Sequence, residues 1–432
     1  MRNSCLVLVL SLVAGSFVHA DDWPQFRGPD RTGVSKEKGL LKAWPKEGPK
    51  LAWTYKNAGL GFSTVSVVKG VVYTLGTDMK FNDGLIIAID EKTGAELWTH
   101  KIGPMFSFKG NTWGDGPRST PTIDGNLLFA LGGQGELICL DLITKKELWR
   151  KNLIKDLNGE MMTKWGYSES PLVDGDLLIC TPGGKNGNLA ALEKKTGKLV
   201  WQTKDWTELA PYSSPIVAEI QGVRQYIQTG YTGGAKGGSV AGVDLKGKVL
   251  WRKQYFTGDS YNTAPTPIVQ GNLVYATEQN GCQLFDINAM QVATEQYKAL
   301  KAKKKVKNNH GGVVLIDGKI YGHTDPGGWI CQDLKTGAEE WLERNQLKCN
   351  SGATTAAEGL LYFYTDEGEV GLVDATPKGF NLVSSFTIPV KSTIPAMRPS
   401  SRESKMWAHP VIANGHLYLR DNEYIFAFKI TK

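Results

Sequence analysis

Short runs in which apolar and polar residues alternate recur along most of the chain, and each run ends in a polar or Gly-rich turn. Between residues 119 and 149 these runs are STPTID, LLFALG, GELICLD and KKELW. Alternation with a period of two predicts half-buried strands, and the 3.6-residue spacing of a helix is absent from this stretch. The predicted structural unit is therefore four short strands joined by tight turns.

This unit repeats, and a large aromatic residue closes each copy. DEKTGAELW at 90–98 returns as DLKTGAEEW at 333–341, and altered copies occur in between. Successive closing aromatics lie 44 to 52 residues apart, at Trp53, Trp98, Trp149, Trp201, Trp251, Tyr297, Trp341 and Phe386. Four antiparallel strands in every such period are typical of a β-propeller blade.

The two ends of the repeat array predict how the ring closes. Inner strands are expected to begin near Ser63, Ser119, Ser168, Ser213, Thr263, His310, Ser351 and Ala408. The last unit has only three strands, and the strand at 50–55 has no inner strands before it. Placing that strand in the last sheet hides two sheet edges. The predicted fold is an all-β, eight-bladed propeller with four antiparallel strands per blade, and seven blades is the alternative.

The recurrent turn has a structural explanation. In DxxTG the Asp side chain can accept backbone N–H groups, and the Gly supplies a positive φ before the last strand. A Trp on the outermost strand buries a large apolar area when it packs against the next blade. The residues predicted to dock neighbouring blades in this way are Trp53, Trp98, Trp149, Trp201, Trp251 and Trp341.

The N-terminal region differs from the repeats. Arg2, the apolar run CLVLVLSLVAGSF and the residues VHA predict a signal peptide at 1–20 that is cleaved after Ala20. A membrane anchor is the alternative, but the apolar run is short for a bilayer span. Residues 21–49 are rich in Gly and Pro, which predicts an extended strap outside the blades. Trp23, Phe26 and Trp44 could fix this strap to the propeller, which is predicted to occupy residues 50–432. The mature protein is expected to be periplasmic or secreted, with no transmembrane segment.

Charge and cysteine content narrow the function classes. The net charge of +7 is moderate, and part of it lies in the segment KALKAKKKVKNNH at 298–310. This segment is either a solvated loop between two strands or a patch that binds an anion or a lipid headgroup. Nothing else indicates nucleic-acid binding. Five Cys follow residue 20, far apart and without a CxxC motif, which predicts buried thiols and excludes c-type haem and Cys-based zinc sites.

The repeat resembles that of a known family. GLIIAIDEKTGAELW and GNLAALEKKTGKLVW are similar to the GxLxAxDxxTGxxxW repeat of the PQQ-like β-propellers. That family includes quinoprotein dehydrogenases and the propeller protein of the outer-membrane β-barrel assembly machinery. DWPQFRGPDRTGVS resembles the start of many exported bacterial members. The resemblance covers residues 21–432 and implies the fold, but the repeated Trp and turn specify the blade and not a cofactor.

Candidate ligand-binding residues come from the starts of the inner strands, which converge at one mouth of the channel. They are Arg118, Trp165, Glu169, Tyr212, Asn262, His310, Asn350, Trp407 and His409. A purely structural mouth would not need Arg, Glu, two His and several aromatics, although a solvated rim tolerates any polar residue. These side chains therefore predict a binding site that either an envelope protein or a small molecule occupies.

Two functions from different classes follow from the resemblance. A PQQ- and Ca²⁺-dependent dehydrogenase would use Glu169 and Asn262 as metal ligands, Asp259 as base, Arg118 as a carboxylate clamp, and Trp165 or Trp407 for stacking. The adjacent-Cys disulfide and the haem motif of many such enzymes are absent, and the chain is shorter. We therefore predict a monomeric, non-catalytic binding or scaffold protein of the cell envelope. No cofactor is assigned to it, and PQQ and Ca²⁺ belong to the alternative function. Saccharide binding at the aromatic mouth is a third hypothesis.

Overall fold

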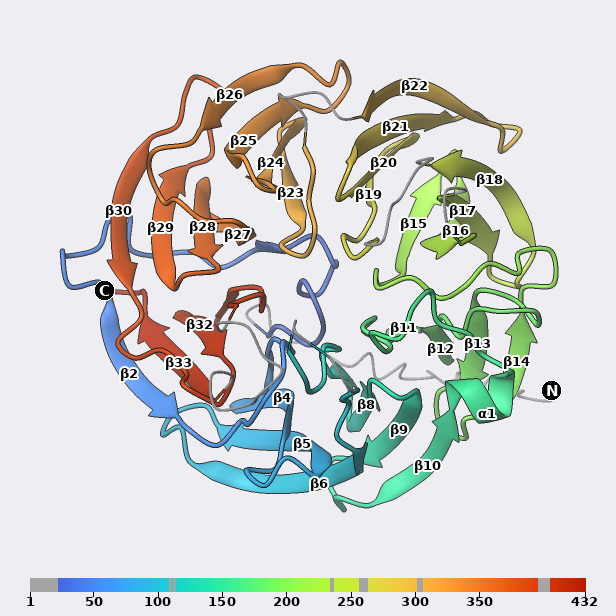
Figure 1. Cartoon of the computed structure of the whole chain (residues 1–432), viewed down its shortest axis with the longest axis horizontal. Helices are drawn as coiled ribbons and strands as arrows, with labels where there is room; N and C mark the ends of the chain where they lie inside the picture. The colour runs from blue at the N-terminus through green and yellow to red at the C-terminus, as the bar shows by residue number, and fades with distance from the viewer. Residues whose placement is uncertain are drawn as a thin grey trace, which may run out of the picture.

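The computed structural model describes residues 22–108, 111, 114–233, 237–255, 263–300, 306–394 and 405–432. Their strands form eight sheets around a central axis, as Figure 1 shows. Each sheet is antiparallel within the blade and runs from an inner to an outer strand. The predicted eight-bladed, all-β propeller is therefore confirmed.

The first three blades follow one another along the chain, and the strands of each run from the axis outward. Blade 1 contains β3 (Ser66–Val68), β4 (Val71–Thr77), β5 (Asp83–Asp90) and β6 (Glu96–Pro104). Blade 2 contains β7 (Thr122–Asp124), β8 (Leu127–Leu131), β9 (Glu136–Asp141) and β10 (Glu147–Asn152). Blade 3 contains β11 (Leu172–Asp174), β12 (Leu177–Cys180), β13 (Ala190–Glu193) and β14 (Leu199–Gln202). One short helix, α1 (Leu153–Leu157), follows β10.

The remaining blades continue in the same order. Blade 4 contains β15 (Ile216–Ile220), β16 (Val223–Tyr231), β17 (Gly238–Asp244) and β18 (Val249–Tyr255). Blade 5 contains β19 (Ile268–Gln270), β20 (Leu273–Glu278), β21 (Gly281–Ile287) and β22 (Ala293–Leu300). Blade 6 contains β23 (Val313–Ile316), β24 (Lys319–Thr324), β25 (Gly328–Asp333) and β26 (Glu339–Glu343). Blade 7 contains β27 (Gly352–Ala357), β28 (Leu360–Thr365), β29 (Glu369–Asp374) and β30 (Leu382–Thr387). Blade 8 contains β31 (Val411–Ala413), β32 (His416–Asp421) and β33 (Tyr424–Lys429).

The N-terminal strand β2 (Lys50–Tyr55) completes blade 8, as predicted. It pairs antiparallel with β33, with Lys50 opposite Lys429 and Tyr55 opposite Ile425. Figure 1 shows the two strands side by side, next to blade 1. The inner strands begin a few residues later than expected at most blades, because the chain first runs extended along the axis outside the sheet.

Most of the predicted docking Trp residues contact the turn of the following blade. Trp53 donates its indole N–H to the backbone oxygen of Glu91 at 2.7 Å, and its ring covers Gly94, where a Cβ atom would lie 2.8 Å away. The same indole N–H bonds, from blade to blade, join Trp149 to the oxygen of Lys194, Trp201 to that of Leu245, and Trp341 to that of Thr376. The Gly of the turn thus provides both the positive φ and the space that the neighbouring ring fills.

Trp98 and Trp251 also pack against the core of the next blade, as predicted, but, in the part of the chain that the structure describes, without an indole hydrogen bond to its turn. The turn of blade 2 has Lys145 at the Gly position, and among the described residues no hydrogen bond joins the Trp98 indole to it. The hairpin of blade 5 is longer and has Ala293 opposite Ile287 at its base. Trp251 instead donates to Gln225 Oε1 of its own blade at 2.6 Å.

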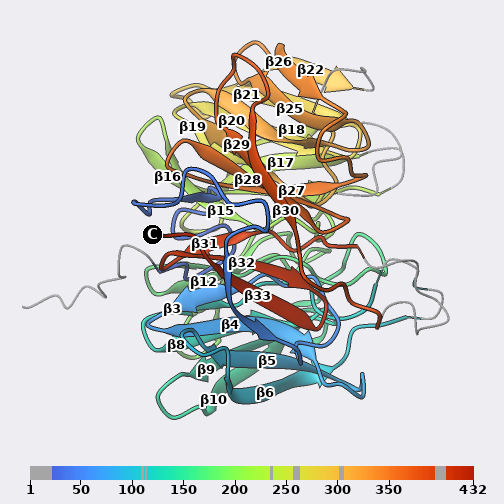
Figure 2. The same cartoon turned by 90° about the vertical axis from the view of Figure 1, so that its left-hand side faces the viewer.

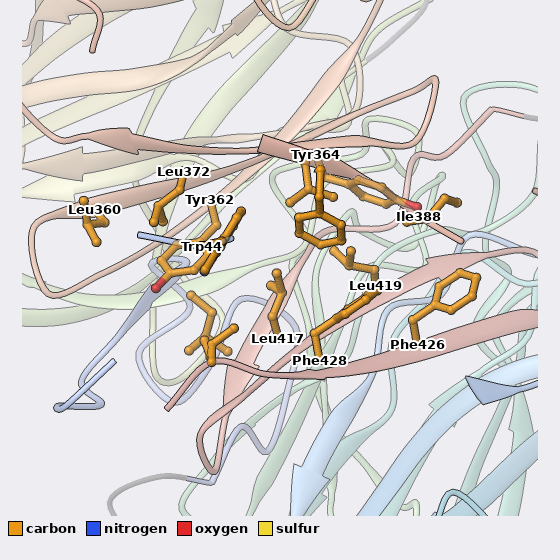
Figure 3. Close-up of a cluster of buried hydrophobic side chains, with 14 of the residues drawn as sticks. Trp44, Leu360, Tyr362, Tyr364, Leu372, Ile388, Leu417, Leu419, Phe426 and Phe428 are labelled. Carbon is orange, nitrogen blue, oxygen red and sulfur yellow. The ribbon is translucent and has the colours of Figure 1, made fainter. Parts of the chain in front are cut away.

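Blade 7 uses a Trp from outside the repeat. Its outer strand places Ser384 in the register that Trp341 has in blade 6, so Phe386 is two positions too far along to be the equivalent residue. Trp44 fills the vacant place: its backbone N–H donates to Ser384 Oγ at 2.8 Å, and its ring packs 5.8 Å from Tyr362 and 5.3 Å from Phe386. Figure 3 shows Trp44 beside Tyr362 in the core between blades 7 and 8.

The turn glycines permit a matched test within blade 3. Gly175 and Gly197 both have positive φ, but a Cβ at Gly175 meets nothing within 4 Å, whereas one at Gly197 would lie 2.7 Å from the Trp149 ring. We expect Gly175→Ala to lower the free energy of unfolding by about 1 kcal/mol through backbone strain alone. Gly197→Ala should cost about 2 to 3 kcal/mol more because the ring must move. Urea denaturation measures both, and equal effects would contradict the docking contact.

Candidate functional site

A cavity of about 790 Å³ lies on the propeller axis, at the face where the chain enters the inner strands. We call it the funnel. Every blade contributes to its wall, and the strap at residues 22–49 contributes Phe26. The volume falls within the range of about 300–1,000 Å³ that is usual for small-molecule sites. Pockets in proteins concentrate at such convergence points, so the funnel is the candidate functional site.

The strap closes the funnel from the opposite face. Trp23 pairs with Val67 of β3 through two backbone hydrogen bonds of 2.8 and 2.9 Å. Phe26 lies edge-on to His409, with ring centroids 5.1 Å apart. Further on, β1 (Val34–Ser35) pairs parallel with β27, so the strap contains a short strand that its sequence does not predict. Figure 2 shows the strap in blue along one face of the ring.

Two buried arginines fix the strap in the channel. Arg27 donates to the backbone oxygens of Val313 at 2.6 Å and of Thr32 at 2.7 Å. Arg31 donates to the oxygens of Ser170 at 3.0 Å and Pro215 at 2.8 Å, and also to that of Pro171. Burial lowers the pKa of Arg31 to about 9, and the nearby Glu169 carboxylate opposes this effect. The strap therefore plugs the channel and makes the funnel a cup with one open end.

One wall of the funnel, from blade 8 round to blade 4, is aromatic. The Trp407 ring stacks on His310 at 4.0 Å, and its tilted contact with Phe62 has a centroid distance of 5.0 Å. The Arg118 guanidinium lies 4.9 Å from the Phe106 centroid and donates to the Trp165 backbone oxygen at 3.0 Å. Arg118 is thus both a cation–π partner and a hydrogen-bonded clamp between blades 2 and 3.

The two histidines of the funnel are neutral at physiological pH. Burial, with the charge of Arg118, lowers the pKa of His310 to about 3. Burial and the charge of Arg27 lower the pKa of His409 to about 4, although its hydrogen bond to the His310 backbone acts to raise it. His409 Nε2 lies 2.9 Å from the His310 backbone oxygen, which can only accept, so Nε2 carries the proton. His409 Nδ1 is consequently an acceptor.

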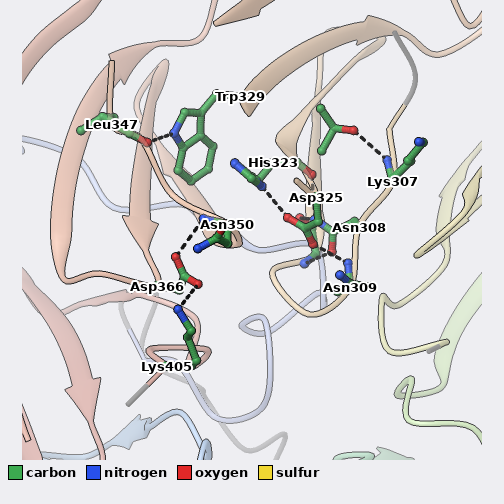
Figure 4. A network of polar contacts seen from close by, with 12 residues as sticks. Lys307, Asn308, Asn309, His323, Asp325, Trp329, Leu347, Asn350, Asp366 and Lys405 are labelled. Carbon is green, nitrogen blue, oxygen red and sulfur yellow. Dashed lines mark hydrogen bonds and ion pairs between the residues drawn. The ribbon is translucent and has the colours of Figure 1, made fainter. Parts of the chain in front are cut away.

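The opposite wall, from blades 5 to 7, is polar. Asp325 accepts the backbone N–H of Asn309 at 2.7 Å, and Asp366 accepts that of Asn350 at 3.1 Å. Figure 4 shows the two carboxylates at the ends of neighbouring blades, with Lys405 beside Asp366. The Lys405 ammonium lies 3.3 Å from Asp366, and this carboxylate raises the pKa of Lys405 despite the opposing effect of burial. Each carboxylate thus holds, through a backbone hydrogen bond, the segment that leads into the inner strand of its own blade.

Four amide side chains complete this wall, and blade 5 supplies two of them. They are Gln279, Asn280, Asn309 and Asn350. Asn309 Oδ1 is buried and accepts from no donor among the described residues. An amide both donates and accepts hydrogen bonds, so this wall matches a ligand that does the same.

Glu169 lies behind the wall and not in it, although its neighbours Ser168 and Ser170 line the funnel. Its side chain is buried, and Oε1 accepts the backbone N–H of Thr181 at 2.5 Å. Burial raises its pKa to about 7, whereas the Thr181 hydrogen bonds and the Arg31 charge act in the opposite direction. Glu169 therefore belongs to the plug of the channel together with Arg31.

This raised pKa predicts a pH dependence of stability. Below its ordinary pKa of 4.5, Glu169 is protonated in both states, and between 4.5 and about 7 only the folded state keeps the proton. The stability contributed by this site is therefore lost as pH rises through that window, by about 3 kcal/mol in total. Glu169→Gln should remove the loss.

The measurement is the difference in unfolding free energy between Glu169→Gln and the wild type from pH 5 to pH 8. We expect it to increase with pH in favour of the variant, while changes at other titrating groups cancel. A constant difference would show that Glu169 has an ordinary pKa.

The structure brings most of the predicted mouth residues to one cavity. Those that line the funnel are Arg118, Trp165, Tyr212, His310, Asn350, Trp407 and His409. Asp259 and Asn262 lie outside the described residues, as does 301–305 of the basic segment, whose end at Lys307 to His310 joins the funnel wall. Sequence reasoning missed Asp325, Asp366 and Lys405. An acidic residue recurs at or directly after the end of the second strand in blades 5 to 8, in ATE, HTD, YTD and LRD, and this signal could have found the two carboxylates.

The described residues do not fit a PQQ and Ca²⁺ site. Glu169, the predicted metal ligand, is separated from the funnel and hydrogen-bonded elsewhere. Trp407 contacts His310 on its ring face and Phe62 beside it, which leaves no open floor for a flat quinone. Within the described ranges, no three His, Cys, Asp or Glu residues cluster as a metal site. The cysteines there are unbonded thiols, and no helix there is long and apolar enough to cross a membrane.

Fold and repeat together define the class: a β-propeller built from PQQ-like repeats. A family profile described as "Outer membrane protein assembly factor BamB" matches residues 82–343, and the chain belongs to this PQQ-like repeat family. The outer membrane protein assembly factor BamB of Kangiella koreensis is 26% identical over 228 residues, which is 51% of this chain and 49% of that protein. The quinohemoprotein alcohol dehydrogenase of Comamonas testosteroni is 28% identical over 206 residues, covering 44% and 27%.

Solved structures show the same fold at lower identity. BamB from Moraxella catarrhalis superposes with a TM-score of 0.61 at 14% identity, over 88% of this chain and 97% of that chain. The Comamonas testosteroni dehydrogenase gives 0.67 at 14% identity, over 95% and 81%. The sequence matches span about half or less of the length of the curated BamB relatives, so these likenesses establish the fold and the family.

Proposed function

We propose that this protein is an exported, non-catalytic binding and scaffold protein of the bacterial cell envelope. The placement of Glu169 carries this proposal. Glu169, the carboxylate predicted as a metal ligand, is part of the structural plug: it accepts a hydrogen bond from Thr181 and lies close to Arg31. The funnel then holds prearranged binding groups on a rigid ring, which is what a scaffold requires.

The relatives named BamB support an envelope protein as partner, because an assembly factor acts by contacting other proteins. The face that carries the strap offers contacts for it. Two turn tips there expose large apolar side chains, with Ile143 at 71% and Met290 at 80% exposure. These lie in the β9–β10 and β21–β22 turns, on the side opposite the open end of the funnel.

The first test separates binding from catalysis. Titration of the purified protein with PQQ, with and without Ca²⁺, should leave the melting temperature and the Trp fluorescence unchanged, because a ligand of the folded state raises the melting point. Ca²⁺-dependent stabilisation together with alcohol oxidation would overturn the proposal.

The second test looks for the partner. A photoreactive amino acid at Ile143 or Met290 should form a discrete crosslinked adduct in cells, whereas the same probe at Lys335, an exposed turn residue of blade 6, serves as the matched control. Adducts of equal yield at all three positions, or at none, would contradict a specific contact on this face.

A further inference from the structure

The funnel is amphipathic in a specific way. Its aromatic wall comes from blades 8 and 1 to 4, and its polar wall, rich in amides and carboxylates, comes from blades 5 to 7. A ligand that fills the cup must therefore present an apolar surface on one side and dense hydrogen-bonding groups on the other. The cup is closed below by Phe26, so the ligand enters by the open end with its tip against the strap.

The unsatisfied atoms of the funnel identify the kind of hydrogen bond that is missing. Asn309 Oδ1 and His409 Nδ1 are both buried, and neither has a donor among the residues of the described ranges. Both are acceptors, the first as an amide oxygen and the second because Nε2 already donates to the His310 oxygen. A buried acceptor without a donor is costly, so a ligand that donates would be favoured there.

Most charged groups of the funnel already have partners. Asp325 is buried between His323 and the backbone N–H of Asn309. Asp366 is buried as well, and the ammonium group of Lys405 is held by Asp366 at 3.3 Å and by Glu367 at 3.3 Å. Arg118 is likewise engaged, by the backbone oxygens of Trp165 at 3.0 Å and Gly114 at 2.9 Å. Lys307 also lines the cavity, and within the described residues no ion pair holds its ammonium group, so phosphate and PQQ are the competing ligands in the test. A hydroxyl group can pair with the amides and the imidazole alike, because it both donates and accepts.

We propose that the funnel binds a neutral saccharide, with the C–H face of a sugar ring against the aromatic wall at Trp165 and Tyr212 and its hydroxyl groups on the amides of blades 5 to 7. Sugar rings combine these two surfaces, and each hydroxyl both donates and accepts. The volume of about 790 Å³ exceeds what one ring fills, so an oligosaccharide of a few units is the expected ligand. This role goes beyond the scaffold function and uses the opposite face of the ring.

The experiment titrates the purified full chain with neutral oligosaccharides of defined linkage, cellotetraose and chitotetraose first, followed by a wider panel of neutral oligosaccharides. Trp fluorescence reports the funnel directly, because Trp165 and Trp407 line it. We expect saturable binding of at least one neutral oligosaccharide. In the double variant Gln279→Ala/Asn350→Ala, binding should weaken about tenfold or more, since two hydrogen-bonding side chains are lost.

Asn126→Ala is the matched control, because this exposed Asn lies in the β7–β8 turn on the other face. It should bind as the wild type does. Co-sedimentation with purified cell-wall glycan separates the two sources of the ligand: sedimentation that free oligosaccharide competes away indicates a wall polymer, and binding of the free oligosaccharide alone indicates a soluble one.

Three outcomes would overturn the proposal. These are no response to any neutral saccharide in the panel, binding that the double variant retains in full, or tighter binding of inorganic phosphate or PQQ than of every sugar. None of them bears on the crosslinking at Ile143 and Met290, so the saccharide site and the scaffold function can fail separately.

Discussion

Replacing Arg31 with methionine is expected to lower the free energy of unfolding by about 3 to 5 kcal/mol at pH 8. The guanidinium donates to the backbone oxygens of Ser170, Pro171 and Pro215, all buried at the starts of two inner strands. Methionine fills a similar volume but removes the donor to the Ser170 and Pro215 oxygens and leaves Glu169 without the charge of Arg31. The Pro171 oxygen keeps the hydrogen bond from the Thr122 hydroxyl. Denaturation by urea, followed by circular dichroism, measures the change.

Lys36→Met is the control for Arg31→Met. Lys36 is in the same strap, and its ammonium pairs with Asp30 at the surface, with side chains 69% and 52% exposed. Such pairs contribute about 0 to 1 kcal/mol. Combining Arg31→Met with Glu169→Gln should recover part of the loss, because no buried carboxylate then lacks its cation. If Arg31→Met is no worse than Lys36→Met, the strap does not plug the channel in solution.

The second large effect is expected at the point where the ring closes. Trp53→Ala removes a buried indole that joins β2 to blade 1 through the Glu91 oxygen and the face of Gly94. We expect a loss of about 3 to 5 kcal/mol, the usual range for a large aromatic truncated in a core. The same change at Trp98, which is half-buried and lacks the bond to the next turn, should cost about 1 to 2 kcal/mol.

Thermal unfolding of the two variants side by side gives the ranking. Both are outer-strand Trp residues of neighbouring blades, so their difference reports the docking contact and not the loss of an indole as such. Equal destabilisation would mean that the Gly-containing turn adds nothing to blade docking.

The sequence was sufficient for the blades because their strands and turns are specified locally. Alternation of apolar residues, the DxxTG turns and the 44 to 52 residue period predict eight sheets and the closing role of strand 50–55. The exceptions arise where a contact is made by residues far apart in the chain. No local signal shows that Trp44 takes the place of a Trp in blade 7, or that the hairpin of blade 5 is extended.

The funnel was predictable in position but only partly in composition. Segments that precede inner strands converge at the axis in any propeller, so Arg118, Trp407 and His409 were found by their place in the repeat. Whether a side chain in such an extended segment faces the cavity or the neighbouring blade depends on local torsion angles, which is why Glu169 was assigned to the wrong side. Arg27 and Arg31 were missed because the strap has no periodicity from which to infer burial.

The shared sheet of β2 and β33 also sets the order in which this protein can fold. Strand β2 is synthesised before the other strands of the eight blades, and its partner β33 after them. Until β33 is made, β2 has no partner strand. The incomplete ring then exposes a sheet edge on each side of the gap where blade 8 belongs. Because its closing contacts join residues more than 300 positions apart, such as Lys50 and Lys429, ring closure is a late and slow step. A chain in which β33 is not yet formed would thus present an almost complete arc with exposed sheet edges, which gives chaperones a reason to bind it.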